Sequence, residues 1–224
     1  MKIRRWIGRA RQVWFRLFEA HRHRRLALEH VEGLDLVSLP ETMNPALFSA
    51  GRLLADVVAA QSRPGMRVLD MGAGTGIVGL RAAAVGASVV AVDVNPAAAR
   101  CARINALLNR LEERMAVLDG DLFEPIGDSR FDIVAFNPPF YRGAPRDAWD
   151  LAWRSPNVAE RFAAGLSEHL AADGWACVVL STSGDAGAFL RAFRAARLSI
   201  CAMKDVDLGY ERLTVYRIAN EANP

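Results

Sequence analysis

The chain has 224 residues, enough for one globular domain with a sizeable core and an appendage. Apolar residues make up 52% of it and charged residues 24%, which excludes a disordered chain. No run approaches the ~18 apolar residues that cross a bilayer, so we expect no transmembrane segment. The 3 cysteines lie far apart without a C-x-x-C pair, which favours a cytoplasmic protein with neither a disulfide framework nor a metal site.

The net charge of +3 hides a basic N-terminal segment. Residues 1–30 carry a charge of +7 from nine Lys and Arg and two Glu, so the rest of the chain is mildly acidic at −4. Apolar residues at steps of three and four predict a basic amphipathic helix within residues 1–32: Ile3, Ile7, Ala10, Trp14 and Leu17. This helix either packs its apolar stripe on the domain, contacts RNA phosphates or lies on an anionic membrane surface.

Residues 33–64 are expected to form a helical segment that leads into the main domain. Its first part, up to Pro45, is rich in turn-forming residues. Asn44-Pro45 is typical of a helix start, and we expect that helix to continue through residues 46–60. Pro64-Gly65 then marks the entry to the main domain.

The main domain, residues 65–224, alternates expected strands and helices. This order predicts an α/β fold with right-handed crossovers and helices on both faces of a mostly parallel, seven-stranded sheet. No helix separates the last two strands, so they should form an antiparallel hairpin at the edge. The strands are expected over residues 67–70, 88–94, 115–118, 131–136, 175–180, 198–206 and 212–218, and the helices over 77–84, 96–108, 156–170 and 186–196.

A glycine-rich turn follows the first of these strands. Glycines at a strand-to-helix turn allow positive φ and a closely approaching ligand, and the helix behind them presents free N–H groups. We therefore expect a small polar ligand across this turn. Gly74 to Gly79 also match G-x-G-x-x-G, a weak dinucleotide fingerprint whose first glycine should follow the strand directly. The turn comprises Asp70 at the end of the strand, then Gly72, Ala73, Gly74 and Gly76.

Acidic residues also follow the next two strands. Asp93-Val94 lies about 20 residues after the glycine turn, where a carboxylate can accept hydrogen bonds from both hydroxyls of a ribose. Asp121-Leu122 follows the third strand. Because parallel strands end at one edge of a sheet, Asp70, Asp93 and Asp121 should line one ligand site.

The tetrapeptide Asn137-Pro138-Pro139-Phe140 directly follows the strand over residues 131–136. Consecutive prolines fix an extended backbone and donate no N–H, and asparagine offers a carbonyl oxygen. A planar NH₂ group could give one hydrogen to the Asn137 side chain and the other to the Pro138 carbonyl, while Phe140 stacks on the planar group. Its nitrogen lone pair would then point at an electrophilic methyl, and proximity and electrostatics would supply most of the catalysis.

These motifs resemble class I S-adenosylmethionine-dependent methyltransferases. Asp70-x-Gly72-x-Gly74-x-Gly76 is similar to their motif I, and the Asn137 tetrapeptide is similar to motif IV of the amino-methylating members. The pattern over residues 40–219 looks like the HemK type, which methylates the glutamine of the Gly-Gly-Gln loop in translation release factors. The resemblance implies a Rossmann-like fold, S-adenosylmethionine as cofactor and a release factor or the ribosome as partner.

The resemblance also implies roles for the site residues. Asp70 and the glycine turn receive the amino-acid end of the cofactor, Asp121 lies near the adenine amine, and Leu122 covers the ring. Asn137 with Pro138, Pro139 and Phe140 would carry the catalysis. We therefore expect an N-methyltransferase that acts on a protein glutamine.

Some features depart from the HemK pattern. Phe140 stands where tyrosine is usual, the basic N-terminal helix is not a family feature, and Tyr141 to Pro156 is expected to form a lid over the substrate. The same motif also serves enzymes that methylate an amine of an rRNA or tRNA base. Further alternatives are a small-molecule acceptor, a catalytically silent scaffold and an NAD-dependent oxidoreductase.

Overall fold

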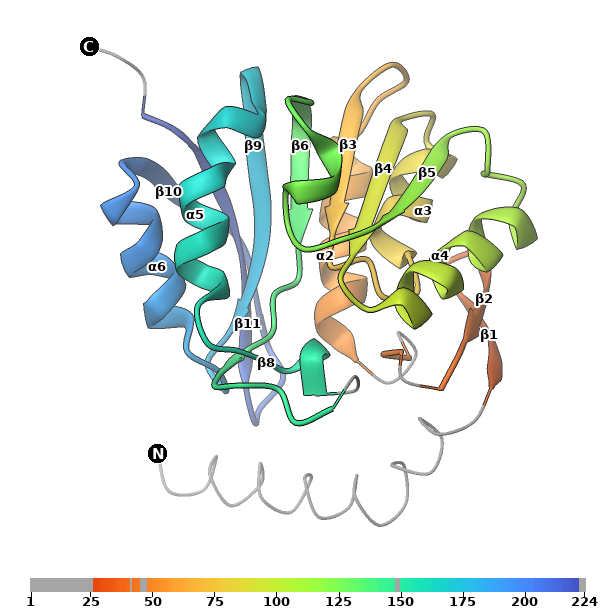
Figure 1. The fold of residues 1–224 in the computed structure, drawn as a ribbon, viewed down its shortest axis with the longest axis horizontal. Helices are drawn as coiled ribbons and strands as arrows, with labels where there is room; N and C mark the ends of the chain where they lie inside the picture. Colours follow the sequence, from red (N-terminus) through yellow and green to blue (C-terminus); the bar gives the residue numbers. More distant parts are fainter. Residues whose placement is uncertain (1–25, 41, 45–47, 148–149, 222–224) are drawn as a thin grey trace.

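The computed structural model describes residues 26–40, 42–44, 48–147 and 150–221. Within them, the main element is a seven-stranded sheet with helices on both faces (Figure 1). Its strands are β3 (Arg67–Met71), β4 (Ser88–Asp93), β5 (Met115–Asp119), β6 (Phe131–Phe136), β9 (Leu170–Ser181), β10 (Leu198–Asp207) and β11 (Arg212–Asn220).

The strand order is β10-β11-β9-β6-β3-β4-β5. The five strands from β9 to β5 pair in parallel, whereas β11 runs antiparallel to both β9 and β10. The expected α/β architecture, with a mostly parallel sheet and a C-terminal antiparallel hairpin at one edge, is therefore confirmed. The order places β3 between β6 and β4, so the loops after these three strands meet at one edge.

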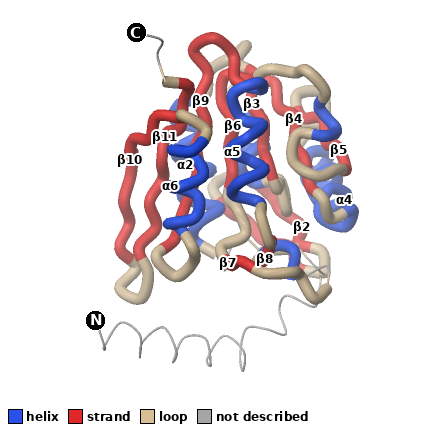
Figure 2. Tube along the Cα trace, turned by 60° about the vertical axis from the view of Figure 1, so that its left-hand side comes forward, coloured by secondary structure: helices blue, strands red, loops and turns tan. Residues whose placement is uncertain are grey.

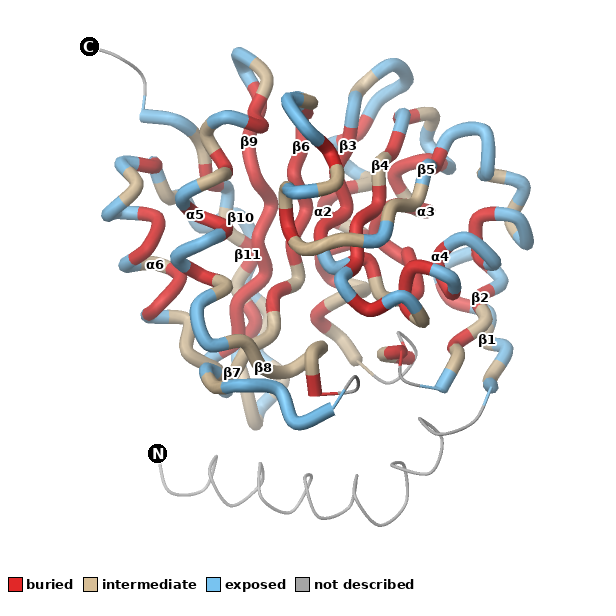
Figure 3. The backbone as a smooth tube through the Cα atoms, in the orientation of Figure 1, coloured by how far each residue is buried: buried red, intermediate tan, exposed pale blue. Residues whose placement is uncertain are grey.

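Two hydrophobic clusters lie on opposite faces of the sheet. Alternate residues of a strand face opposite sides, so Val68 belongs to one cluster and its neighbour Leu69 to the other. Figure 3 shows that buried residues run through the middle strands. The first cluster joins α2 (Ser49–Gln61), α3 (Ile77–Ala84) and α4 (Pro96–Leu108), and the second joins α5 (Val158–His169) and α6 (Ala186–Ala195).

Residues 27–38 form a hairpin that was not expected. β1 (Ala27–Val31) and β2 (Leu34–Ser38) pair antiparallel around Glu32-Gly33, whose φ angles of 52° and 80° suit the twist of a tight hairpin. The helix expected over residues 1–30 is therefore wrong for residues 27–30, because this turn closes a hairpin there. The expected turn-rich approach from residue 33 is likewise wrong over β2. The rest of the expected helix lies in residues 1–25, outside the described ranges.

Two other boundaries differ from expectation. α2 begins at Ser49, and the expected helix start at residues 45–47 lies outside the described ranges. β9 begins at Leu170 instead of Trp175, and α5 ends one residue before it. Gly174 lies within β9, and a Cβ there would be 2.5 Å from the Phe131 carbonyl oxygen. This glycine permits a close backbone approach where the pairing register slips.

The segment expected as a lid has its own short elements. β7 (Tyr141–Arg142) and β8 (Arg154–Ser155) pair in parallel, and a 3₁₀ turn, η4 (Asp150–Ala152), lies between them. A second such turn, η3 (Glu124–Ile126), follows β5. Figure 2 shows β7 and β8 at one end of the large sheet, apart from its strands. In the part of the chain that the structure describes, no helix has the length and apolar character to cross a membrane.

Gly79→Ala should destabilise the fold by about 1–3 kcal/mol, because the new methyl group overpacks the α3–sheet contact. A Cβ at Gly79 would lie 3.0 Å from Val89 Cγ1, 3.1 Å from Asp70 Oδ2 and 3.1 Å from Met115 Cε. Urea unfolding of the variant measures the loss.

Gly51→Ala is the matched control, since Gly51 is also the third residue of its helix but has no atom nearer than 3.9 Å to its Cβ position. It should be neutral or stabilise the fold by up to about 1 kcal/mol through helix propensity. Equal effects of the two substitutions would contradict the packing argument.

Candidate active site

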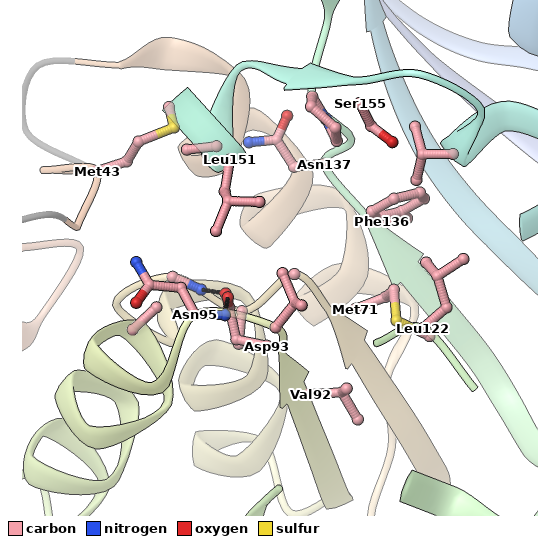
Figure 4. Close-up of a pocket in the computed structure, with 18 of the residues that line it drawn as sticks. Met43, Met71, Val92, Asp93, Asn95, Leu122, Phe136, Asn137, Leu151 and Ser155 are labelled. Atoms are coloured by element: carbon pink, nitrogen blue, oxygen red, sulfur yellow. Dashed lines mark hydrogen bonds between the residues drawn. The ribbon is translucent and has the colours of Figure 1, made fainter. Parts of the chain in front are cut away.

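A cavity of about 320 Å³ lies at the carboxyl ends of β3, β4 and β6. Figure 4 shows Asn137 and Leu151 on one side of it, and Asp93 and Asn95 on the other. This is the edge at which open α/β sheets bind ligands. The expected site residues that line the cavity are Asp70, Gly72, Ala73, Gly74, Asp93, Val94, Asp121, Leu122, Asn137 and Pro139.

The glycine turn joins β3 to α3 with a backbone that needs glycine. Gly72, Gly74 and Gly76 have φ angles of 66°, 58° and 81°, in the left-handed region. Gly72 and Gly74 line the cavity, whereas Gly76 is not among its lining residues. A Cβ at Gly76 would lie 3.1 Å from Ala102 Cβ, so this glycine lets α3 approach α4 closely. Gly76 therefore has a packing role, and its expected role in binding a ligand stays a prediction.

Asp70 and Asp93 are both buried and hold the turn through backbone hydrogen bonds. Asp70 Oδ2 accepts a hydrogen bond of 2.8 Å from the N–H of Gly79, in the first turn of α3. Asp93 accepts from the N–H groups of Gly74 at 2.8 Å and Asn95 at 2.9 Å. The two carboxylates therefore fix both the glycine turn and the start of the following helix.

The same two carboxylates form an acidic floor of the cavity, and no basic side chain of the described residues pairs with them. Burial raises the pKa of Asp70 to about 7, the Gly79 N–H opposes this rise, and the charge of Asp93 adds to it. Burial likewise raises the pKa of Asp93, against the hydrogen bonds from Gly74 and Asn95. Among the described residues, neither carboxylate has a salt bridge to Lys or Arg. A cationic ligand in the cavity would offset the cost of burying these charges.

Asp121 and Leu122 form another wall, with Val94 half-exposed at the cavity mouth. Leu122 has a φ of 50°, a strained conformation for a residue with a Cβ, and is itself buried. Arg161 of α5 ion-pairs with Asp121 at 2.8 Å and also lines the cavity. The Phe123 ring stacks on His169 of α5, with their centroids 4.5 Å apart. The loop after β5 is thus anchored to α5.

The Asn137 tetrapeptide is divided between the cavity and the core. Asn137 and Pro139 line the cavity, whereas Pro138 is buried and is not among the lining residues. Asn137 Oδ1 is a buried acceptor that has no hydrogen-bond partner among the described residues. An unpaired buried oxygen in a cavity wall is costly unless a ligand donates to it.

Phe140 does not occupy the expected stacking position. It is absent from the cavity lining and packs against the core cluster on the α2 side of the sheet. Its carbonyl oxygen accepts a hydrogen bond of 2.8 Å from the Asp185 N–H, and a Cβ at Gly184 would lie 2.5 Å from it. The Phe140 backbone therefore ties the tetrapeptide to the residue before α6, and the half-buried ring packs against the core.

Two segments outside the sheet and its glycine turn supply further lining residues. Met43, Phe48 and Gly51 precede or begin α2, and they carry no motif that would identify them in the sequence. Residues within 141–156, expected as a lid, supply further lining, as the lid hypothesis implies. The rings of Phe48 and Trp153 meet edge to face at 5.2 Å and join the two segments.

Asp150 organises the second of these segments. Its carboxylate accepts from both the backbone N–H of Arg146, at 3.1 Å, and its guanidinium, at 3.0 Å. These bonds lower the pKa of Asp150. Arg154 ion-pairs with the same carboxylate at 3.4 Å and lines the cavity. Charge pairing therefore fixes Arg154, a residue of the expected lid, in the cavity wall.

The comparisons with known proteins agree with this architecture. The model of the family called methyltransferase small domain matches residues 44–200, and the chain belongs to this family. Among solved structures, the 16S rRNA N2 G1207 methyltransferase of T. thermophilus, in complex with AdoMet and guanosine, has a TM-score of 0.68 at 22% identity. The match covers 88% of this chain and 50% of that one, and it shows a shared Rossmann-like methyltransferase fold.

Curated relatives have different named acceptors. A release factor glutamine methyltransferase of Geobacter sulfurreducens is 33% identical over 130 residues, which is 57% of this chain and 43% of that protein. A tRNA1(Val) (adenine(37)-N6)-methyltransferase of Porphyromonas gingivalis is 37% identical over 93 residues, which is 38% of this chain and 36% of that protein. The chain spans about half the length, or less, of the curated relatives that it matches.

The cofactor of this family is S-adenosylmethionine, and the residues of the cavity fit it. The glycine turn leaves open space beside Gly74, which has no atom within 4 Å of its Cβ position, so a ligand can approach the backbone there. The buried carboxylates of Asp70 and Asp93 suit a ligand that carries positive charge. Asp93 would hold the ribose hydroxyls and Asp121 with Leu122 the adenine, as expected from the sequence.

Asp70→Asn should change how stability depends on pH. The unfolded chain releases the Asp70 proton near pH 3.8, whereas the folded chain holds it to about pH 7. Between these values the folded state binds more protons, so this group's contribution to stability is lost as pH rises through the window, with no further loss above it. Urea unfolding of the variant and of the wild type at pH 4 to 8 tests this.

The stability of the variant relative to wild type should increase from about pH 4 to about pH 7 and then stay level. Asparagine keeps an oxygen for the Gly79 N–H, so the hydrogen bond itself is conserved in the comparison. A difference that is constant over the whole pH range would contradict the burial argument.

Proposed function

We propose that this protein is an S-adenosylmethionine-dependent N-methyltransferase whose acceptor is the side-chain amide of a protein glutamine, as in the release factor enzymes it resembles. The observation that carries the proposal is the unpaired, buried Asn137 Oδ1 in the wall of the cofactor cavity. It is suited to receive one hydrogen of a planar NH₂ group.

The side chains of the cavity have separate tasks in this proposal. The bound cofactor supplies a sulfonium methyl group as the electrophile. Asn137 Oδ1 accepts a hydrogen bond from the acceptor NH₂. This hydrogen bond orients the nitrogen and directs its lone pair at the methyl group. Phe140 contributes by fixing the tetrapeptide to the core, where its carbonyl is bonded to the Asp185 N–H.

An amine on an RNA base is the second candidate acceptor. It presents the same planar NH₂ group, and a tRNA adenine methyltransferase is among the relatives. The charge of +7 over residues 1–30 favours a partner that carries phosphates. RNA binding would weaken steeply with salt, whereas methylation of a peptide glutamine would not.

Asn137→Ala should lower kcat by about 10²–10³, the effect of removing one hydrogen-bonding group from a preorganised site. Its affinity for S-adenosylmethionine should stay within about threefold of wild type, because the acidic floor and the glycine turn are untouched. Asn220→Ala is the control, since Asn220 is exposed at the end of β11 that lies away from the cavity. A parallel loss of kcat and of cofactor affinity in the Asn137 variant would contradict its role at the acceptor.

Transfer of a labelled methyl group from S-adenosylmethionine identifies the acceptor class. Purified release factor, ribosomes and total RNA are incubated with the wild type and with the Asn137→Ala variant. Label that enters protein with the wild type only, and that is recovered as methylglutamine, is the expected result. Label that ribonuclease removes would support the RNA base instead. Cofactor binding without label in any fraction would contradict both acceptors and leave a small molecule or a silent scaffold.

A further inference from the structure

Two asparagines, Asn105 of α4 and Asn109 directly after its last residue, bind the backbone of β2 in the same way. Asn105 Oδ1 accepts from the Val37 N–H at 2.7 Å, and its Nδ2 donates to the Val37 carbonyl at 2.9 Å. Asn109 Oδ1 accepts from the Asp35 N–H at 3.1 Å, and its Nδ2 donates to the Asp35 carbonyl at 2.8 Å. Each side-chain amide thus takes the place of a neighbouring strand.

The spacing of the two elements makes this double contact possible. Four residues of a helix rise by about 6 Å, and two residues of a strand by about 6.6 Å. Asn105 and Asn109 therefore face Val37 and Asp35 at nearly the same interval. This ladder attaches the β1–β2 hairpin to α4, although the hairpin pairs with no strand of the large sheet in the described part of the chain.

Asn105 differs from Asn109 in its contact with the glycine turn and in its burial. Its Nδ2 also donates to the Thr75 carbonyl at 2.9 Å, and the Asn105 side chain is fully buried. Thr75 lies between Gly74 and Gly76, is itself buried and lines the cavity. The third hydrogen bond of Asn109 returns to its own helix, to the Asn105 carbonyl. Only Asn105 therefore connects the hairpin to the glycine turn.

The Thr75 carbonyl belongs to the peptide that precedes Gly76, so its hydrogen bond sets the orientation of that peptide in the turn. Without Asn105 this buried oxygen would lack its partner, and the turn would have to move to satisfy it. Such a movement would displace Gly74, whose N–H is bonded to Asp93 at 2.8 Å.

We propose that Asn105 is a positioning residue for the cofactor site, which holds the glycine turn through Thr75 and couples it to the β1–β2 hairpin. The inference rests on the proposed function only in taking S-adenosylmethionine as the ligand of the cavity. Coupling free energies are reciprocal, so cofactor binding strengthens the attachment of the hairpin as much as the hairpin strengthens cofactor binding.

Calorimetric titration with S-adenosylmethionine compares Asn105→Ala with Asn109→Ala. Both substitutions remove two hydrogen bonds to β2, but only the first frees the Thr75 carbonyl. The dissociation constant should rise at least about tenfold for Asn105→Ala and stay within about twofold of wild type for Asn109→Ala. Saturating cofactor should restore kcat in the Asn105 variant. Equal effects of the two substitutions on the dissociation constant would overturn the proposal.

Hydrogen exchange of the wild-type protein provides a test that needs no variant to fold. The amides of Val37 and Asp35 both donate to an asparagine side chain, and only the first of these asparagines touches the turn. Cofactor should slow exchange of Val37 more than that of Asp35. No difference between the two amides would overturn the coupling. Failure of the wild type to bind S-adenosylmethionine at all would instead contradict the proposed function.

Discussion

Burial of two carboxylates beneath the glycine turn is the constraint on which the site depends. Asp70 and Asp93 end neighbouring parallel strands, and their bonds to the N–H groups of Gly79 and Gly74 determine where the backbone turns into α3. Burial raises the pKa values of both carboxyl groups, because a charged carboxylate at the floor of the cavity is costly without a positive charge beside it. A cationic cofactor relieves this cost, which explains why a carboxylate-lined turn suits S-adenosylmethionine better than an anionic dinucleotide.

The other walls of the cavity are added by segments that the parallel sheet does not itself require. Met43, Phe48 and Gly51 come from the residues before and at the start of α2, and the described residues within 141–156 are arranged around the buried Asp150. An edge-to-face contact between Phe48 and Trp153 joins the two sides. The sheet therefore determines where the cofactor lies, whereas these segments shape the space that is left for the acceptor. This division is consistent with the different acceptors for which relatives of this chain are named, a release factor glutamine and a tRNA adenine.

The sequence predicted the sheet and most of the cofactor side because those features depend on local signals. Strand Phe131–Phe136 and helix Pro96–Leu108 have the expected bounds, since apolar runs and a proline at the first helical position specify them. The hairpin was missed because Glu32-Gly33 is a weak turn signal. Nothing local in the sequence shows that Gly184 leaves room for the Phe140 backbone to approach it. Asn105 owes its role to a contact between distant segments, which a single sequence does not show.

Thermal unfolding with S-adenosylmethionine or with NAD tests most directly whether the cavity is a site for S-adenosylmethionine. A ligand at 100 times its dissociation constant adds about 2.7 kcal/mol of stability, which is readily seen as a rise in Tm. We expect S-adenosylmethionine to raise the Tm of the wild-type chain and NAD to leave it unchanged. The rise should be lost in Asp93→Ala, which removes the carboxylate bonded to the glycine turn. A rise in Tm with NAD and none with S-adenosylmethionine would contradict the account.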